Sequence, residues 1–122
     1  MKHTREEKLK AFGRLLDVQH RLRKECPWDR KQTNESLRPN TIEEVFELCD
    51  ALMKNDSKEI KKELGDVMEH IMFYSIIGNE NDEFDIADVC NQEADPGEIS
   101  NSCYNISVHF LSPSPVLLRG LL

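Results

Sequence analysis

Apolar residues recur at intervals of three and four near the start of the chain, the spacing of one face of an amphipathic helix. They are Leu9, Phe12, Leu15, Leu16, Val18 and Leu22. Glu6 and Glu7 precede them, in the first turn, where the helix dipole favours carboxylates. The pattern predicts a first helix from Thr4 to about Lys24.

A polar stretch without a period follows at residues 26–39. Pro27 and Pro39 lie in it, and proline is disfavoured inside a helix because it lacks the backbone N–H donor. The stretch also contains Trp28, the only tryptophan. We predict an ordered loop here, which can include a helical turn.

The periodic pattern returns twice along the middle of the chain. The second apolar set comprises Ile42, Val45, Phe46, Cys49, Leu52 and Met53, and the third comprises Ile60, Leu64, Val67, Met68, Ile71 and Met72. Thr41 followed by Glu44 fits a capping box, so the second helix is predicted to begin after Thr41 and to run to about Lys54. Residues 55–57 make a tight break, and Gly78–Asn79 is predicted to close the third helix. The two helices should form a hairpin.

A fourth helix is predicted to begin near Phe84 and to be cut short by Asp95-Pro96-Gly97. From Gln92 onward the chain is rich in serine and proline and has no period. We therefore predict an all-α, four-helix domain at residues 1–91 and an irregular tail at residues 92–122. A chain of 122 residues is long enough for one compact domain and too short for two.

Composition narrows the classes of partner. With a net charge of −7 and a pI near 5.1, the chain lacks the dense basic surface that binding to nucleic acid or an anionic membrane requires. The cysteines form no Cys-x-x-Cys pair and the histidines lack zinc-finger spacing, so neither a disulfide framework nor structural zinc is indicated. No apolar run reaches membrane-spanning length. We expect a soluble cytoplasmic protein with reduced thiols.

Two acidic pairs carry the candidate chemistry: Glu44 with Glu47, and Glu63 with Asp66. Residues three apart share a helix face, and the predicted hairpin can bring the pairs opposite each other. Four converging carboxylates need cations, and carboxylate oxygens with room for water suit Mg²⁺ or Mn²⁺ bound to substrate phosphates. The same spacing also fits a solvent-exposed acidic face.

The patterns of the second and third predicted helices support different interpretations of these acidic pairs. A projection at about 100° per residue places the first acidic pair opposite the apolar stripe of its own helix, as a solvated face requires. Glu63 and Asp66, however, share a sector of the third helix with His70. That sector continues into the apolar residues Phe73 and Ile77. A seam that ends apolar is expected to be covered by protein, so its acidic half should line a cleft where cations are recruited.

Several neighbouring residues have two interpretations. Glu44 either caps its helix or binds metal, since a carboxylate that reaches back to cap the helix cannot direct both oxygens at a metal. Glu43 is favoured by the helix dipole, or it orients or deprotonates a metal-bound water. Trp28 anchors the loop or stacks on a nucleobase. Lys31 and Lys62 contact phosphate or make surface ion pairs.

Three segments are recognisable as a set: Cys26-Pro27-Trp28-Asp29-x-x-Gln32-Thr33, Arg38-Pro39-x-Thr41-Ile42-Glu43-Glu44-x-x-Glu47 and Glu63-Leu64-Gly65-Asp66. Over residues 5–91 the chain resembles the MazG family of nucleoside triphosphate pyrophosphohydrolases. The resemblance implies an all-α fold, assembly as a homodimer, and hydrolysis of a nucleoside triphosphate to the monophosphate and pyrophosphate.

The resemblance also implies roles for the matching positions. The metal ligands for Mg²⁺ would be Glu44, Glu47, Glu63 and Asp66. Glu43 would orient the attacking water, while the metal ions neutralise the phosphates and the leaving pyrophosphate. We take Trp28 as the candidate contact to the base, and Lys31 and Lys62 as candidate contacts to phosphate.

Residues 92–122 depart from the family pattern, which usually continues the fourth helix through a basic stretch. A shift of reading frame near Asn91 is one hypothesis for the departure. Two alternative functions stay open: a MazG-like module that binds metal or nucleotide with impaired turnover, and an acidic helical interaction protein.

Overall fold

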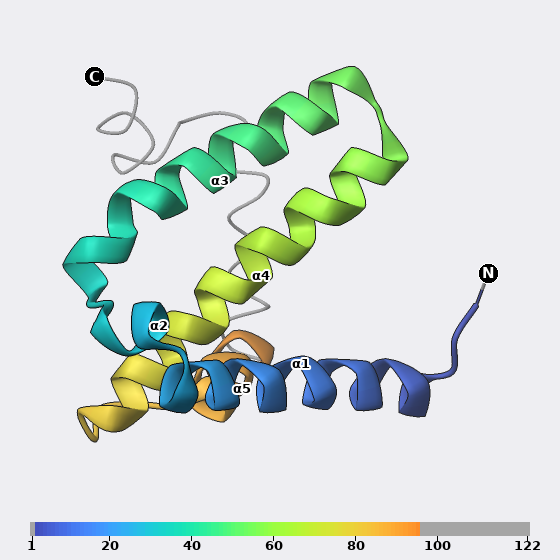
Figure 1. Cartoon of the computed structure of the whole chain (residues 1–122). Helices are drawn as coiled ribbons and strands as arrows, with labels where there is room; N and C mark the ends of the chain where they lie inside the picture. Colours follow the sequence, from blue (N-terminus) through green and yellow to red (C-terminus); the bar gives the residue numbers. More distant parts are fainter. Residues whose placement is uncertain (1, 96–122) are drawn as a thin grey trace. The chain divides into compact units, whose positions relative to one another are not determined.

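The computed structural model describes residues 2–95, which form five α-helices and no strand (Figure 1). They are α1 (Arg5–Glu25), α2 (Pro27–Lys31), α3 (Asn34–Lys54), α4 (Ser57–Glu80) and α5 (Ile86–Ala94). The prediction of an all-α fold is confirmed. The chain divides between Asp85 and Ile86 into two units, so α5 is described by itself.

Helix α1 begins where the sequence predicts. Thr4 is its N-cap: the Thr4 hydroxyl accepts a hydrogen bond from the Glu7 backbone at 3.1 Å, and the Glu7 carboxylate accepts one from the Thr4 backbone at 3.0 Å. This reciprocal arrangement satisfies two backbone donors that a helix start otherwise leaves unpaired.

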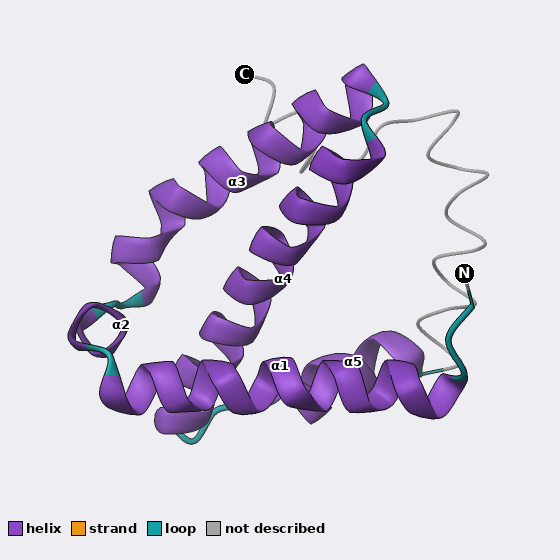
Figure 2. Ribbon diagram, turned by 45° about the vertical axis from the view of Figure 1, so that its right-hand side comes forward, coloured by secondary structure: helices purple, strands orange, loops and turns teal. Residues whose placement is uncertain are grey.

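Helices α3 and α4 form the predicted hairpin and run antiparallel, side by side (Figure 2). Asn55 ends α3 in the left-handed conformation, with φ 55°, which asparagine tolerates better than most residues. Asp56 then caps α4, because its carboxylate accepts from the backbone N–H groups of Lys58 and Glu59 at 3.1 and 3.3 Å. The predicted break is confirmed at Asn55 and Asp56, and Ser57 is already the first residue of α4.

The start of α3 differs from the prediction. The helix begins at Asn34, with Thr33 as N-cap, and the side chains of Thr33 and Ser36 each accept from the other's backbone N–H. Pro39 lies inside the helix. The prediction of Thr41 as N-cap is therefore wrong, and the predicted loop at 26–39 contains α2 and the first turns of α3. Glu44 has no capping role.

The apolar core lies at the C-terminal half of α4, where Leu37 of α3 packs with Phe73 and Ile77. Arg23 of α1 lies over the Phe73 ring, 5.6 Å from its centroid. The Arg23 guanidinium also donates to both carboxylate oxygens of Glu80 at 2.8 Å and to two backbone carbonyls at the end of α2. One side chain thus joins α1, α2 and α4.

Gly78 does not end its helix as predicted. It is buried within α4, which continues to Glu80. A Cβ at this position would lie 2.6 Å from Cε2 of Phe84, so the glycine permits close approach of that ring. Helix α5, the predicted fourth helix, starts at Ile86, two residues after Phe84.

Part of the predicted tail is helical. Helix α5 reaches Ala94, so residues 92–94, which were expected to be irregular, belong to it. Residues 96–122 lie outside the described part of the chain. Among residues 2–95, no helix combines the length and apolar character needed to cross a membrane.

The apolar stripe predicted for α3 faces away from α4. Its members include Ile42, Val45 and Phe46, and Phe46 is 71% exposed. The face that meets α4 instead carries Leu37, which joins the core, and Thr41, whose hydroxyl bonds to α4. Glu44 therefore lies on the inner side of the hairpin, while Glu47 and the apolar stripe are exposed.

Candidate metal centre

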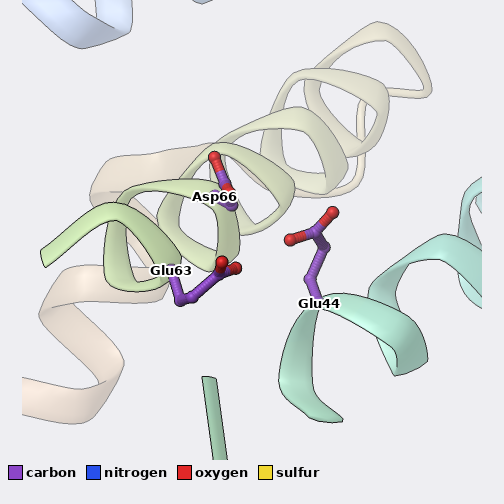
Figure 3. A group of neighbouring side chains, drawn as sticks. All are labelled: Glu44, Glu63 and Asp66. Atoms are coloured by element: carbon purple, nitrogen blue, oxygen red, sulfur yellow. The ribbon is translucent and has the colours of Figure 1, made fainter. Parts of the chain in front are cut away.

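Helices α3 and α4 bring three carboxylates together at the acidic half of the hairpin. Glu44 points from α3 toward Glu63 and Asp66 on α4 (Figure 3). One oxygen from each of the three lies within 4.8 Å of the others. The spacing of three residues between Glu63 and Asp66 places both on the face of α4 that Glu44 meets. We call these residues the carboxylate trio.

Burial makes the trio costly without a cation. The Glu63 side chain is 7% exposed. The Oε2 atoms of Glu44 and Glu63 are both buried and have no hydrogen-bond partner. Removing a charged carboxylate oxygen from water without a partner is unfavourable, whereas a hard divalent cation prefers such oxygens. The donor set thus fits Mg²⁺ or Mn²⁺.

The electrostatics point the same way. Burial raises the pKa of Glu44 above its ordinary value, and the neighbouring carboxylates of Glu47, Asp66 and Glu63 raise it further. Lys62 opposes this effect only in part. Negative charge is therefore in excess at the site, and a bound cation would remove the repulsion.

Lys62 is paired with the trio. Its ammonium donates to Oε1 of Glu63 and to Oδ2 of Asp66, each at 3.0 Å. These two bonds raise the pKa of Lys62 above its ordinary value. The structure thus places Lys62 at the predicted site, where its partners are carboxylates.

Glu47, the fourth predicted ligand, is not part of the trio. It is exposed on α3 and lines an adjoining cleft of about 570 Å³. The cleft is lined by Phe46, Glu47, Asp50, Ala51, Lys54, Asp56, Glu59 and Glu63. Glu63 belongs to both the trio and the cleft, so a group bound at the trio has open space beside it.

The other predicted site residues are not members of the trio. Glu43 is exposed on α3. Trp28, which is 53% exposed, and Lys31 lie on α2. Within residues 2–95 no hydrogen bond or ion pair joins Trp28 or Lys31 to the trio.

A polar network beside the trio was not predicted from the sequence. The Thr41 hydroxyl is 2.7 Å from Nδ1 of His70 and is also hydrogen-bonded to the hydroxyl of Tyr74. Thr41 lies three residues before Glu44, and His70 lies four residues after Asp66, so the network fixes the two helices one turn away from the trio. The sequence signal for this network was the spacing of Asp66, His70 and Tyr74 at intervals of four, which places them on one face of α4.

Comparison with known proteins agrees with this geometry. Residues 32–95, more than half of the chain, match the MazG nucleotide pyrophosphohydrolase domain. The chain therefore belongs to the MazG nucleotide pyrophosphohydrolase domain family.

Curated relatives carry the corresponding names. The chain is 38% identical over 85 residues to the nucleoside triphosphate pyrophosphohydrolase of Escherichia coli K12, covering 67% of this chain and 32% of that protein. It is 42% identical over 80 residues to the nucleoside triphosphate pyrophosphohydrolase/pyrophosphatase MazG of Thermotoga maritima, covering 64% and 31%. For the Mycolicibacterium smegmatis pyrophosphohydrolase the figures are 36% over 83 residues, 64% and 26%. The chain spans about a third of the length of these relatives or less.

Proposed function

We propose that this chain is a Mg²⁺-dependent nucleoside triphosphate pyrophosphohydrolase that releases the monophosphate and pyrophosphate. The observation that carries the proposal is the carboxylate trio, with two buried oxygens that lack a partner. Membership in the MazG domain family and the names of the relatives support the substrate class. Such a reaction would remove nucleotides from the cellular pool.

We assign the following roles to residues of the chain. Glu44, Glu63 and Asp66 would hold Mg²⁺ or Mn²⁺, together with Glu47 in the adjoining cleft. When bound, the metal would neutralise phosphate charge and make water more acidic. Glu43 would orient the attacking water.

The substrate contacts are proposed on chemical grounds. Lys62 and Lys31 contact phosphate oxygens through their ammonium groups, and Trp28 stacks on the base through its exposed ring. The Thr41 hydroxyl keeps α3 and α4 in register, so that the carboxylates stay opposed.

We also propose that the protein is a homodimer. The exposed apolar residues of α3 and α4 form the surface that a second copy would cover. They are Ile42, Val45, Phe46, Leu52, Met53, Leu64, Met68 and Ile71. The net charge of −7 argues against nucleic acid as a partner. The free thiols of Cys26, Cys49 and Cys90 suit the reducing cytoplasm, where nucleoside triphosphates occur.

Pyrophosphate release tests the proposal. The purified chain is incubated with Mg²⁺ and a panel of nucleoside triphosphates, beside Asp66→Asn, Glu47→Gln and the control Asp17→Asn, whose carboxylate is exposed on α1. We expect release by the wild type and the control, with strong loss in both site variants. Metal binding without turnover in the wild type would favour a binding module, and absence of both would refute the enzyme and the metal site together.

A further inference from the structure

Lys62 occupies the edge of the trio as an internal cation. Its Nζ atom lies 3.0 Å from Glu63 and 3.0 Å from Asp66, so it bridges two of the three proposed ligands. In the part of the chain that the structure describes, no other lysine or arginine pairs with the trio. The side chain is 60% exposed and reaches the carboxylates from the solvent side.

One ammonium does not complete the site. It engages Oε1 of Glu63 and Oδ2 of Asp66, whereas Oε2 of Glu63 and Oε2 of Glu44 are buried without a partner. The opposing carboxylate of α3 is thus left out of the bridge. A divalent cation, which gathers six oxygens around one centre, can engage all three residues.

The ammonium and the metal would bind the same two carboxylates, those of Glu63 and Asp66. The Lys62 side chain is 60% exposed and lysine has a long flexible stem, so its ammonium can move into solvent when an incoming cation takes its place on the carboxylates. Glu63 is held by burial and cannot follow it. The fixed carboxylates stay in place while the mobile ammonium moves.

We propose that Lys62 is a resident counter-ion of the metal centre. Without metal, its ammonium holds Glu63 and Asp66 together; a divalent cation displaces it, and the released ammonium then meets the phosphates of the metal-bound triphosphate. The ammonium of Lys62 would thus exchange carboxylate partners for phosphate partners between the two states. The inference rests on the proposed metal site.

The proposal predicts that loss of the Lys62 ammonium changes the affinities for two ligands in opposite directions. Replacing Lys62 with methionine removes the competitor, so the metal alone should bind more tightly. The same substitution removes a phosphate contact, so the metal complex of a nucleoside triphosphate should bind more weakly. A lysine that made only a surface ion pair would change neither affinity in this pattern.

Calorimetric titration with Mn²⁺, without nucleotide, measures the first effect. The variants are Lys62→Met and Lys62→Gln, and the control is Lys61→Met, because Lys61 is exposed and makes no ion pair with residues 2–95. We expect Mn²⁺ to bind both Lys62 variants about three- to tenfold more tightly than the wild type, and the control within about twofold. Equal or weaker Mn²⁺ binding by both Lys62 variants would overturn the proposal.

Steady-state kinetics measures the second effect at saturating Mg²⁺. We expect KM for the triphosphate to rise about five- to tenfold in Lys62→Met, with a smaller change in kcat, and to stay unchanged in Lys61→Met. A KM unchanged by Lys62→Met would overturn the second half of the proposal. Failure of the wild type to bind Mn²⁺ would instead refute the metal site itself, so the two failures are distinguishable.

Discussion

The two ends of helix α4 carry charge clusters of opposite character. At the C-terminal end, the guanidinium of Arg23 donates two hydrogen bonds of 2.8 Å to the carboxylate of Glu80. It also donates hydrogen bonds to two backbone carbonyls. Hydrogen bonding to Arg23 lowers the pKa of Glu80. At the N-terminal half, three carboxylates face one exposed ammonium, and burial together with the neighbouring anions raises the pKa of Glu44.

This difference indicates that one end of α4 stabilises the fold and the other end forms the candidate metal site. Where cation and anion are matched and lie on the apolar core, the cluster stabilises the fold. Where anions are in excess and buried, the folded chain retains repulsion that a bound cation would remove. Helix α4 therefore begins as a candidate metal site and ends as a scaffold, and the two halves should respond differently to mutation.

The largest expected effect on stability lies at the apolar end. Phe73 is 4% exposed beneath Arg23, so Phe73→Ala leaves a cavity and should lower the free energy of unfolding by about 3–5 kcal/mol. Leu9→Ala, at a position that is 52% exposed on α1, should cost much less. Urea denaturation of both variants provides the test, and similar losses would contradict the placement of the core.

At the acidic end, activity and stability should separate. Glu63→Gln should reduce pyrophosphate release at least about 100-fold, which corresponds to about 2.7 kcal/mol of transition-state stabilisation. Its metal-free stability should not fall, because a buried neutral amide is less costly than a buried, incompletely paired carboxylate. Glu69→Gln, on the same helix but outside the trio, is the control. If the Glu63→Gln variant were active, or strongly destabilised, Glu63 would have a structural role and not a metal-binding one.

A smaller effect on the free energy of unfolding should appear at the ion pair between Arg23 and Glu80, and this effect should depend on pH. The pKa of Glu80 is lowered in the fold, so its contribution to stability is present above the ordinary value of 4.5 and is lost as pH falls through the folded value. Glu80 is partly exposed, and we expect Glu80→Gln to cost about 0.5–1 kcal/mol at pH 7. The gap between the two urea curves should narrow below pH 4.5, and a gap that widened instead would show that the sign is wrong.

The sequence predicted the fold where local signals are strong. Thr4 marked the start of α1, and Asn55 with Asp56 marked the hairpin turn. The start of α3 was missed because proline is disfavoured inside a helix, yet Pro39 lies in the second turn of α3. Gly78 was misread because a glycine that ends a helix and one that admits a ring look alike in sequence.

The site was predicted in part for similar reasons. Spacing along α3 and α4 identified Glu44, Glu63 and Asp66, which the hairpin brings together. The pairing of Thr41 with His70 joins residues 29 apart in sequence and depends on helix register, which periodicity does not give. Periodicity likewise found the apolar face of α3 without revealing that α4 covers the opposite face.

Thermal unfolding with and without Mg²⁺ at pH 7.5 tests most directly whether the excess of buried carboxylates is a metal site. If the trio binds Mg²⁺, the wild type should gain about 2.7 kcal/mol at a concentration 100 times the Kd, seen as a rise in Tm, while Glu63→Gln shows little or no rise. An equal rise in Tm for the wild type and Glu63→Gln, or no rise in either, would contradict this assignment.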